Sequence, residues 1–240
     1  MMDWRDTGFV LTARRHGESA AIVELLTEAH GRHAGLVRGG QSPKRRALLQ
    51  PGNLVAASWR GRLPEHLGTF EIELLRAHAA ELIDDPDRLA ALSSAAALIA
   101  LALPEHEPHG DVFQDLARLI AALDSTGWPT QYVGWECALL AALGFGLDLS
   151  TCAATGVNDD LAYVSPRSGR AVSRSAGAPY HEKLLPLPGF LWRDGPAEGA
   201  EIISGLTLTG HFLHHHLLEP QGRLLPEARA RLADRLRRLV

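Results

Sequence analysis

Cysteine is scarce in this chain, which limits the classes of protein to consider. Cys137 and Cys152 are the two cysteines in 240 residues, and neither has a neighbouring partner at metal-ligand spacing. A disulfide framework is therefore excluded, and reduced thiols are predicted. A nucleophilic role for Cys152 would need an adjoining base, and no short motif supplies one, so a buried and inert thiol is the favoured interpretation.

Long apolar runs are also missing. The best candidate, residues 89–103, is broken by Ser93 and Ser94 and stops before Pro104, short of the roughly 20 residues that cross a bilayer. The first six residues carry acids and no apolar stretch follows them, which argues against a signal peptide. The sequence predicts no membrane span and a cytoplasmic protein.

Aromatic residues are few, at 6% of the chain, whereas hydrophobic residues reach 46%. Alanine and leucine must therefore supply most of the core, which favours helices. At this length we expect one or two small modules on a helical body.

The chain as a whole lacks the positive charge that is typical of nucleic-acid-binding proteins, since its formal net charge is −4. That charge is unevenly distributed along the sequence. Residues 1–62 contain ten Arg or Lys and five acidic residues, a balance of +5, so the remainder carries −9. A basic front part fits a polyanionic partner.

Short strand-like runs broken by glycine and proline fill this basic part. They cover residues 8–13, 20–26, 33–37, 54–59 and 68–75. Gly39, Gly40 and Pro43 predict a loop after the third strand. Five short strands over this length fit a small barrel such as an OB-fold, which leaves few exposed edges.

After residue 75, apolar residues recur at helical spacing. The predicted helices cover residues 87–103, 111–123, 132–143, 206–218 and 226–239. Residues 150–204 are irregular and rich in glycine and proline, with a hairpin expected near 162–172. The predicted fold class is α+β, with an OB-fold barrel over residues 1–78, a helical domain over 79–149 and 205–240, and a loop-rich insertion over 150–204.

The strongest functional signal is a run of cations on the predicted loop, formed by Arg38, Lys44, Arg45 and Arg46 without an acid among them. Such cations bind phosphates and release counterions, which gives affinity that is independent of sequence and falls with salt. Phe9 or Trp59 could stack a base, although Trp59 by itself is more typical of a core. The predicted DNA-binding set is Arg14, Arg15, Arg32, Arg38, Lys44, Arg45, Arg46, Trp59, Arg60 and Arg62. From the residues alone, nucleic-acid binding and a merely solvated basic surface stay equally open.

Other chemistry has weaker support. The chain contains neither the spacing of a phosphate-binding nucleotide loop nor a dinucleotide-binding glycine motif. His211, His214 and His215 share one side of a predicted helix and could hold Zn²⁺, but packed or surface histidines explain the pattern equally well. We therefore predict no catalytic residue, metal or cofactor. A metal-dependent hydrolase using these histidines and a protein adaptor without DNA affinity remain the alternatives.

Six ordered blocks in the front part carry a family pattern, at residues 4–11, 15–19, 22–27, 30–32, 35–39 and 49–53. They resemble the N-terminal domain of the RecO recombination mediators. Residues 132–136, 139–140 and 143–149 resemble the helical domain of that family more weakly. The resemblance thus extends over about the whole chain and is strongest at the front.

The resemblance implies an OB-fold that binds single- and double-stranded DNA and anneals complementary strands coated with single-stranded-DNA-binding protein (SSB). It further implies binding of the acidic C-terminal tail of SSB, joint action with RecR in loading RecA at gaps, nucleoid association and no catalytic residues. Many family members hold structural zinc through two CxxC pairs in the segment that corresponds to residues 152–176. Here Cys152 remains, while Thr155, Ser173 and Ala176 occupy the other ligand positions. Because one thiolate cannot close a tetrahedral site, we expect a zinc-finger-like insertion that has lost its metal ligands.

Overall fold

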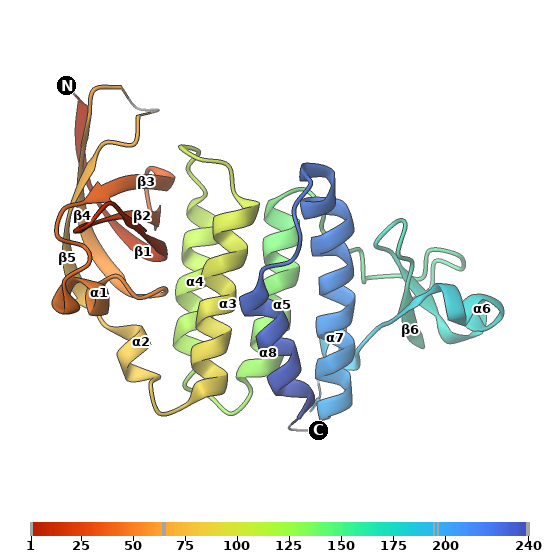
Figure 1. Cartoon of the computed structure of the whole chain (residues 1–240). Helices are drawn as coiled ribbons and strands as arrows, with labels where there is room; N and C mark the ends of the chain where they lie inside the picture. Colours follow the sequence, from red (N-terminus) through yellow and green to blue (C-terminus); the bar gives the residue numbers. More distant parts are fainter. Residues whose placement is uncertain (1, 64–65, 194, 196, 239–240) are drawn as a thin grey trace. The chain divides into compact units, whose positions relative to one another are not determined.

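The computed structural model describes residues 2–63, 66–193, 195 and 197–238 (Figure 1). The chain divides into two compact units. Unit 1 comprises Met1–Ile120 and Pro226–Leu232, and unit 2 comprises Ala121–Leu225 and Ala233–Val240. The observed class is α+β, as predicted. The domain boundaries expected from the sequence stay a prediction.

Unit 1 begins with a five-stranded closed barrel whose strand order, β1-β2-β3-β5-β4, fits the OB-fold. The strands are β1 (Met2–His16), β2 (Ala20–Thr27), β3 (Gly31–Val37), β4 (Leu54–Gly61) and β5 (Thr69–Arg76), which confirms the five predicted strands. Strand β1 is longer than predicted because it pairs with two other strands. Its first half pairs with β4 and its second half with β2, and a bulge lies between Val10 and Thr12.

The barrel interior is filled by alternate side chains of the strands. Val10, Val23, Val55 and Trp59 are all at most 1% exposed. Alternation of inward and outward residues follows from the two-residue repeat of a strand. Truncating a large buried side chain of this kind typically costs about 3–5 kcal/mol, so the inward face accounts for much of the stability of the barrel.

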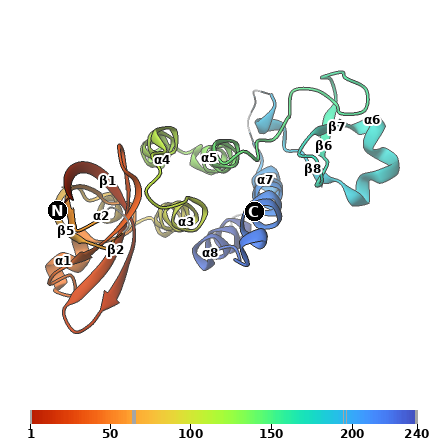
Figure 2. The ribbon, with the colours of Figure 1, turned by 90° about the horizontal axis from the view of Figure 1, so that it is seen from above.

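Four helices of unit 1 follow or interrupt the strands: α1 (Pro43–Leu48), α2 (His78–Glu81), α3 (Pro86–Ala102) and α4 (Gly110–Ala122). Asp85 caps α3 by accepting hydrogen bonds from the backbone N–H groups of Asp87 and Arg88. Helix α3 packs on β1, and Phe113 of α4 meets Phe9 with ring centroids 5.0 Å apart. Figure 2 shows α3 and α4 side by side next to the barrel.

In unit 2, α5 (Trp128–Ala142) packs against α7 (Gly199–Phe212). The strands β6 (Leu161–Val164), β7 (Ala171–Ser173) and β8 (Leu185–Pro186) form a small sheet, and the short helix α6 (Arg174–Gly177) follows β7. The β6–β7 pair confirms the hairpin expected near residues 162–172.

The predicted helix over residues 206–218 is not uniform. Helix α7 ends at Phe212, and a π-helical turn (Leu213–Leu218) and a 3-10 turn (Glu219–Gln221) continue the chain. Helix α8 (Glu227–Arg237) has residues in both units, and Leu239 at the predicted end of this helix lies outside the described residues. Within the described ranges, no helix has the length and apolar character that a bilayer crossing requires.

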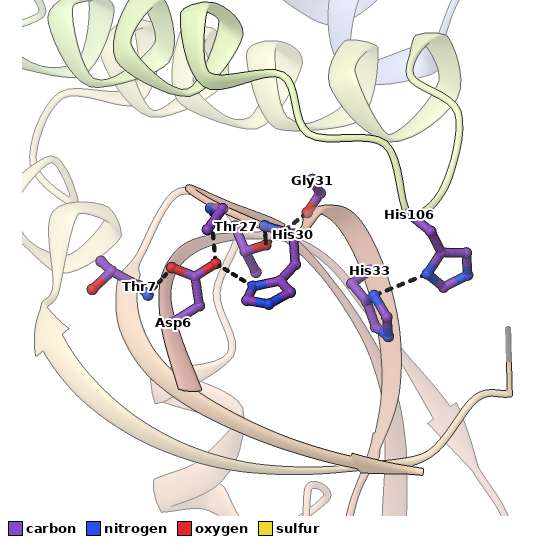
Figure 3. A network of polar contacts seen from close by, with 8 residues as sticks. Asp6, Thr7, Thr27, His30, Gly31, His33 and His106 are labelled. Carbon is purple, nitrogen blue, oxygen red and sulfur yellow. Dashed lines mark hydrogen bonds and ion pairs between the residues drawn. The ribbon is translucent and has the colours of Figure 1, made fainter. Parts of the chain in front are cut away.

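A carboxylate anchors the β2–β3 turn to β1 (Figure 3). Asp6 accepts hydrogen bonds from the backbone N–H groups of Thr7 and Ala29 at 2.8 and 2.9 Å, and it pairs with His30 Nδ1 at 2.8 Å. Burial raises the pKa of Asp6, but these hydrogen bonds outweigh burial and leave the pKa below its ordinary value. The side chain therefore acts as an ionised clamp on the turn.

The connection between α3 and α4 lies against β3. The backbone N–H of His106 donates to the carbonyl of Arg32 at 2.9 Å, and the Arg32 guanidinium donates to the carbonyl of Leu103 at 2.9 Å. Arg32 also pairs with Glu24 at 2.9 Å and Glu105 at 3.2 Å. One arginine thus holds two strands and the helix connection together.

His33 and His106 meet at the same contact (Figure 3), with their Nδ1 atoms 2.9 Å apart. One ring must donate and the other accept, so protonation of both would replace this bond by repulsion. His33 is 4% exposed and lies edge-on to Trp59, and its Nε2 has no hydrogen-bond partner among the described residues. Burial, followed by the charges of His106 and His30, lowers the pKa of His33 to about 4.

Gly31 provides a test of the loop contact. Its φ is +68°, and an added Cβ would lie 1.9 Å from the carbonyl oxygen of Glu107, whereas Gly17, with φ +60°, has no atom within 4 Å of such a Cβ. We expect Gly17→Ala to lower the free energy of unfolding by roughly 1–2 kcal/mol through backbone strain alone. Gly31→Ala should cost about 1–3 kcal/mol more, because the backbone of the connection must move. Urea unfolding measures the free energy of unfolding of both variants. Equal losses in the two variants would contradict a tight contact between Gly31 and the backbone of Glu107.

The lowered pKa of His33 predicts acid sensitivity near neutral pH. Because the folded pKa of about 4 lies below the unfolded value of 6.5, the unfolded state binds the proton first as pH falls. Stability is therefore full above pH 6.5 and declines toward pH 4, with a loss of about 2 kcal/mol between pH 7 and pH 5. His33→Phe should reduce this dependence in urea unfolding at several pH values. The exposed His181→Ala should keep the wild-type profile, and a His33→Phe profile as steep as wild type would refute the assignment.

Candidate nucleic-acid interface

Six of the predicted DNA-binding residues gather at one end of the barrel. Arg14 and Arg15 lie in the last residues of β1, and Arg15 is opposite Ala21 of β2. Ala21 is in turn opposite Val37 of β3, immediately before Arg38. Neighbouring strands therefore bring these three arginines to one rim.

Helix α1 carries the other three cations to the same rim, which corrects the expectation that they lie on a loop. Pro43 at the start of α1 has a fixed φ that suits a first helical turn. Lys44 and Arg46 are exposed, and half-buried Arg45 donates to the carbonyl of Ile72 at 3.5 Å. We call the six residues Arg14, Arg15, Arg38, Lys44, Arg45 and Arg46 the basic end of the barrel.

The turn before α1 is fixed to the β1–β2 turn by Gln41. Its backbone N–H donates to the carbonyl of Ser19 at 3.0 Å, and its side-chain amide donates to the carbonyl of Ala20 at 3.2 Å. The position of α1 relative to the end of β1 is therefore set by hydrogen bonds as well as by chain connection.

A groove of about 440 Å³ opens between these elements, with Arg15 and Arg46 in its walls. Gln41 and Gln50 add two amides, and its remaining lining residues are Ala13, Ala21, Gly40, Leu49 and Pro51. A Cβ on Gly40 would lie 2.6 Å from the Cβ of Ala21, so glycine permits the close approach of the two segments. Neither glutamine could be predicted from the sequence as a groove residue. No motif marks them, because they meet the arginines only through tertiary contacts.

The cations of the basic end are available to an anionic ligand. Within the described part of the chain, none of the six forms an ion pair with a carboxylate. Exposed and unneutralised arginine and lysine side chains on one rim create a positive potential that attracts phosphates.

Arg60 and Arg62 lie at and just after the end of β4, outside the groove. Arg60 is opposite Asp3 near the start of β1 and opposite Thr69 of β5, which pairs in turn with Leu36 near the end of β3. Arg15 and Arg46 therefore line the groove, whereas the other two predicted cations, Arg60 and Arg62, do not.

Three aromatic or cationic residues that the sequence suggested for DNA contact are buried or already bonded within the protein. Trp59 is 1% exposed and donates from Nε1 to the carbonyl of Leu67 at 3.2 Å, and Phe9 is 3% exposed. Neither ring offers a free face for base stacking. Arg32 is engaged by Glu24, Glu105 and a backbone carbonyl, as described above.

The four positions that correspond to the family's zinc ligands do not fit zinc. Cys152 is 1% exposed and accepts a hydrogen bond from the backbone N–H of Ser173 at 3.2 Å, while its thiol lies 3.5 Å from the Ser173 hydroxyl. Ala176 supplies a backbone N–H that donates to that hydroxyl and has no side-chain donor atom. A thiol, two hydroxyls and a methyl group are not a zinc ligand set.

The histidines near the end of α7 are arranged differently from the sequence expectation. Ligand atoms of His214, His215 and Glu219 lie within 4.8 Å of one another, and His211 is not in this group. His216 Nε2 lies 3.3 Å from the carbonyl of Pro166.

Comparison with known proteins assigns the family. The model described as "Recombination protein O N terminal" matches residues 1–78, and "Recombination protein O C terminal" matches residues 83–224. The chain belongs to the RecO family. Proteins named "DNA repair protein RecO" from Rhodospirillum centenum and Rhodospirillum rubrum are 55% and 53% identical to it. The alignments cover 99% of this chain in both cases, and 96% and 98% of the respective relatives.

A third relative, the "DNA repair protein RecO" of Cereibacter sphaeroides, is 51% identical over 99% of this chain and its own full length. The matches therefore extend from the barrel through unit 2. Family membership assigns the protein to DNA repair and recombination, in a family of mediators rather than a known family of catalysts.

Proposed function

We propose that the chain is a recombination mediator that binds single- and double-stranded DNA through the basic end of its barrel. In this role it anneals complementary strands coated with SSB, binds the SSB C-terminal tail and helps RecR to load RecA at gaps. The barrel over residues 1–78 holds DNA, whereas the helical domain and the insertion over 150–204 recruit protein partners.

The observation that carries the proposal is the basic end itself. Six cations from β1, α1 and the β3–α1 connection share one rim without carboxylate partners among the described residues, and a groove runs between Arg15 and Arg46. OB-folds bind single strands along such grooves, at roughly 4–16 nucleotides per fold.

The composition of the groove indicates how DNA is held. None of the residues that line it is aromatic, and the barrel's Trp59 and Phe9 are buried. Binding should therefore depend on phosphate contacts and amide hydrogen bonds, which carry little sequence preference. Neutralised phosphates also repel a second strand less strongly, which favours annealing.

Titration into fluorescently labelled single-stranded DNA, bare or coated with cognate SSB, tests the proposal. We expect affinity that falls steeply with salt, together with faster annealing of coated complementary strands. No binding at low salt would favour an adaptor that acts without DNA contact. Binding to bare DNA without faster annealing of coated strands would contradict the mediator role.

A pair of double variants distinguishes the groove from cations outside it. Arg15→Ala/Arg46→Ala should weaken binding of a short single strand equally for different sequences, because both residues are assigned to phosphates. It should also reduce the slope of log Kobs against log salt by about 1.4, since each phosphate contact on a single strand contributes about 0.7.

Arg60→Ala/Arg62→Ala removes the same charge from the end of β4, outside the groove, and is the matched control. For a strand of about ten nucleotides, which is within the site size of an OB-fold, the salt slope of this variant should stay close to that of the wild type. An equal loss in both double variants would assign binding to overall charge and would remove the groove from the proposal.

A further inference from the structure

The π-helical turn Leu213–Leu218 gives the end of α7 an unusual geometry. In such a turn the backbone bonds residue i to residue i+5, and these turns often occur at functional sites. Leu213, Leu217 and Leu218 are at most 6% exposed and hold the turn in place. The i, i+5 relation brings His214 and Glu219 onto neighbouring turns, although an α-helix would point them in different directions.

The histidines of this turn have separate environments. His216 contacts the carbonyl of Pro166 at 3.3 Å and stacks on Phe212, with ring centroids 5.2 Å apart. His214 is partly exposed and His215 is exposed, and His215 Nδ1 lies 2.7 Å from Glu219 Oε2. His216 therefore packs against the fold, while His214, His215 and Glu219 are accessible to solvent.

These three side chains offer two imidazole nitrogens and a carboxylate oxygen, all within 4.8 Å of one another. Ligand atoms around one zinc ion lie roughly 3–4 Å apart, because each is about 2.1 Å from the metal. Accessible side chains can close the remaining gap by small rotations within their rotamer wells. The set also contains the converging carboxylate that the histidine pattern alone did not reveal.

We propose that His214, His215 and Glu219 form a surface site for a late first-row divalent cation, with Zn²⁺ as the probe. Two imidazoles and a carboxylate suit zinc, and they leave a further coordination position open to water or to a ligand from another molecule. The site lies outside the residues assigned to DNA and is distinct from the Cys152 region.

The bound ion would join two consecutive turns of the chain. Glu219 begins the 3-10 turn that follows the π-helical turn, so coordination by His214, His215 and Glu219 would connect these two segments. Because the unfolded chain does not hold the three ligands in this geometry, the ion should stabilise the folded state.

Metal binding should be measured on untagged, full-length protein by equilibrium dialysis against Zn²⁺ and metal analysis. We expect one Zn²⁺ per chain in the wild type and its loss in His214→Ala/His215→Ala. Glu219→Gln should weaken binding by about tenfold or more. Zn²⁺ should also raise the Tm of the wild type but not that of the double variant.

Two further variants separate this site from other candidates. Cys152→Ser and His181→Ala should keep one Zn²⁺ per chain, and Co²⁺ substitution should give ligand-field bands without a thiolate charge-transfer band. If the double variant does not fold, His215→Ala and Glu219→Gln, which change exposed side chains, provide the same test. Less than one Zn²⁺ per wild-type chain, or undiminished binding in these variants, would overturn the proposal.

Discussion

The structure of unit 1 depends on β1 pairing with two strands at once. Its first half binds β4 and its second half binds β2, so a single continuous strand closes the barrel. The register of these two pairings fixes which residues of β4 and β2 lie beside each half of β1. Arg14 and Arg15 lie in the half of β1 that pairs with β2, whereas Arg60 is opposite Asp3 in the half that pairs with β4.

The β2–β3 turn and β3 bind the barrel to the connection between α3 and α4. Asp6 clamps the turn to β1, and Arg32 ties β3 to β2 and to the α3–α4 connection. Gly31 permits the backbone of that connection to approach, and the His33–His106 bond completes the contact. Ionisable groups are thus used here for structure, and Arg32 shows that a cation in a basic segment need not face a ligand.

The basic end, by contrast, consists of cations that the fold positions but does not neutralise. Gln41 fixes the turn before α1 through the backbone carbonyls of Ser19 and Ala20. Neighbouring cations without acidic partners repel one another and contribute little to stability. In the second unit, the π-helical turn similarly leaves polar side chains at the surface while three leucines hold it in place.

The sequence alone determined the five strands, the main helices, the hairpin of the insertion and the charge asymmetry, because these follow from local periodicity, turn residues and composition. It also identified the family through ordered blocks at its front. Only the tertiary structure showed that Trp59 and Phe9 are buried, that Arg32 is ion-paired and that Lys44 to Arg46 lie on a helix. Only the tertiary structure also showed that Gln41 and Gln50 line a groove with Arg15 and Arg46. It likewise showed that Glu219 lies beside His214 and His215. The physical reason is that burial, ion pairing and convergence depend on residues distant in sequence or on an irregular turn, which no local pattern encodes.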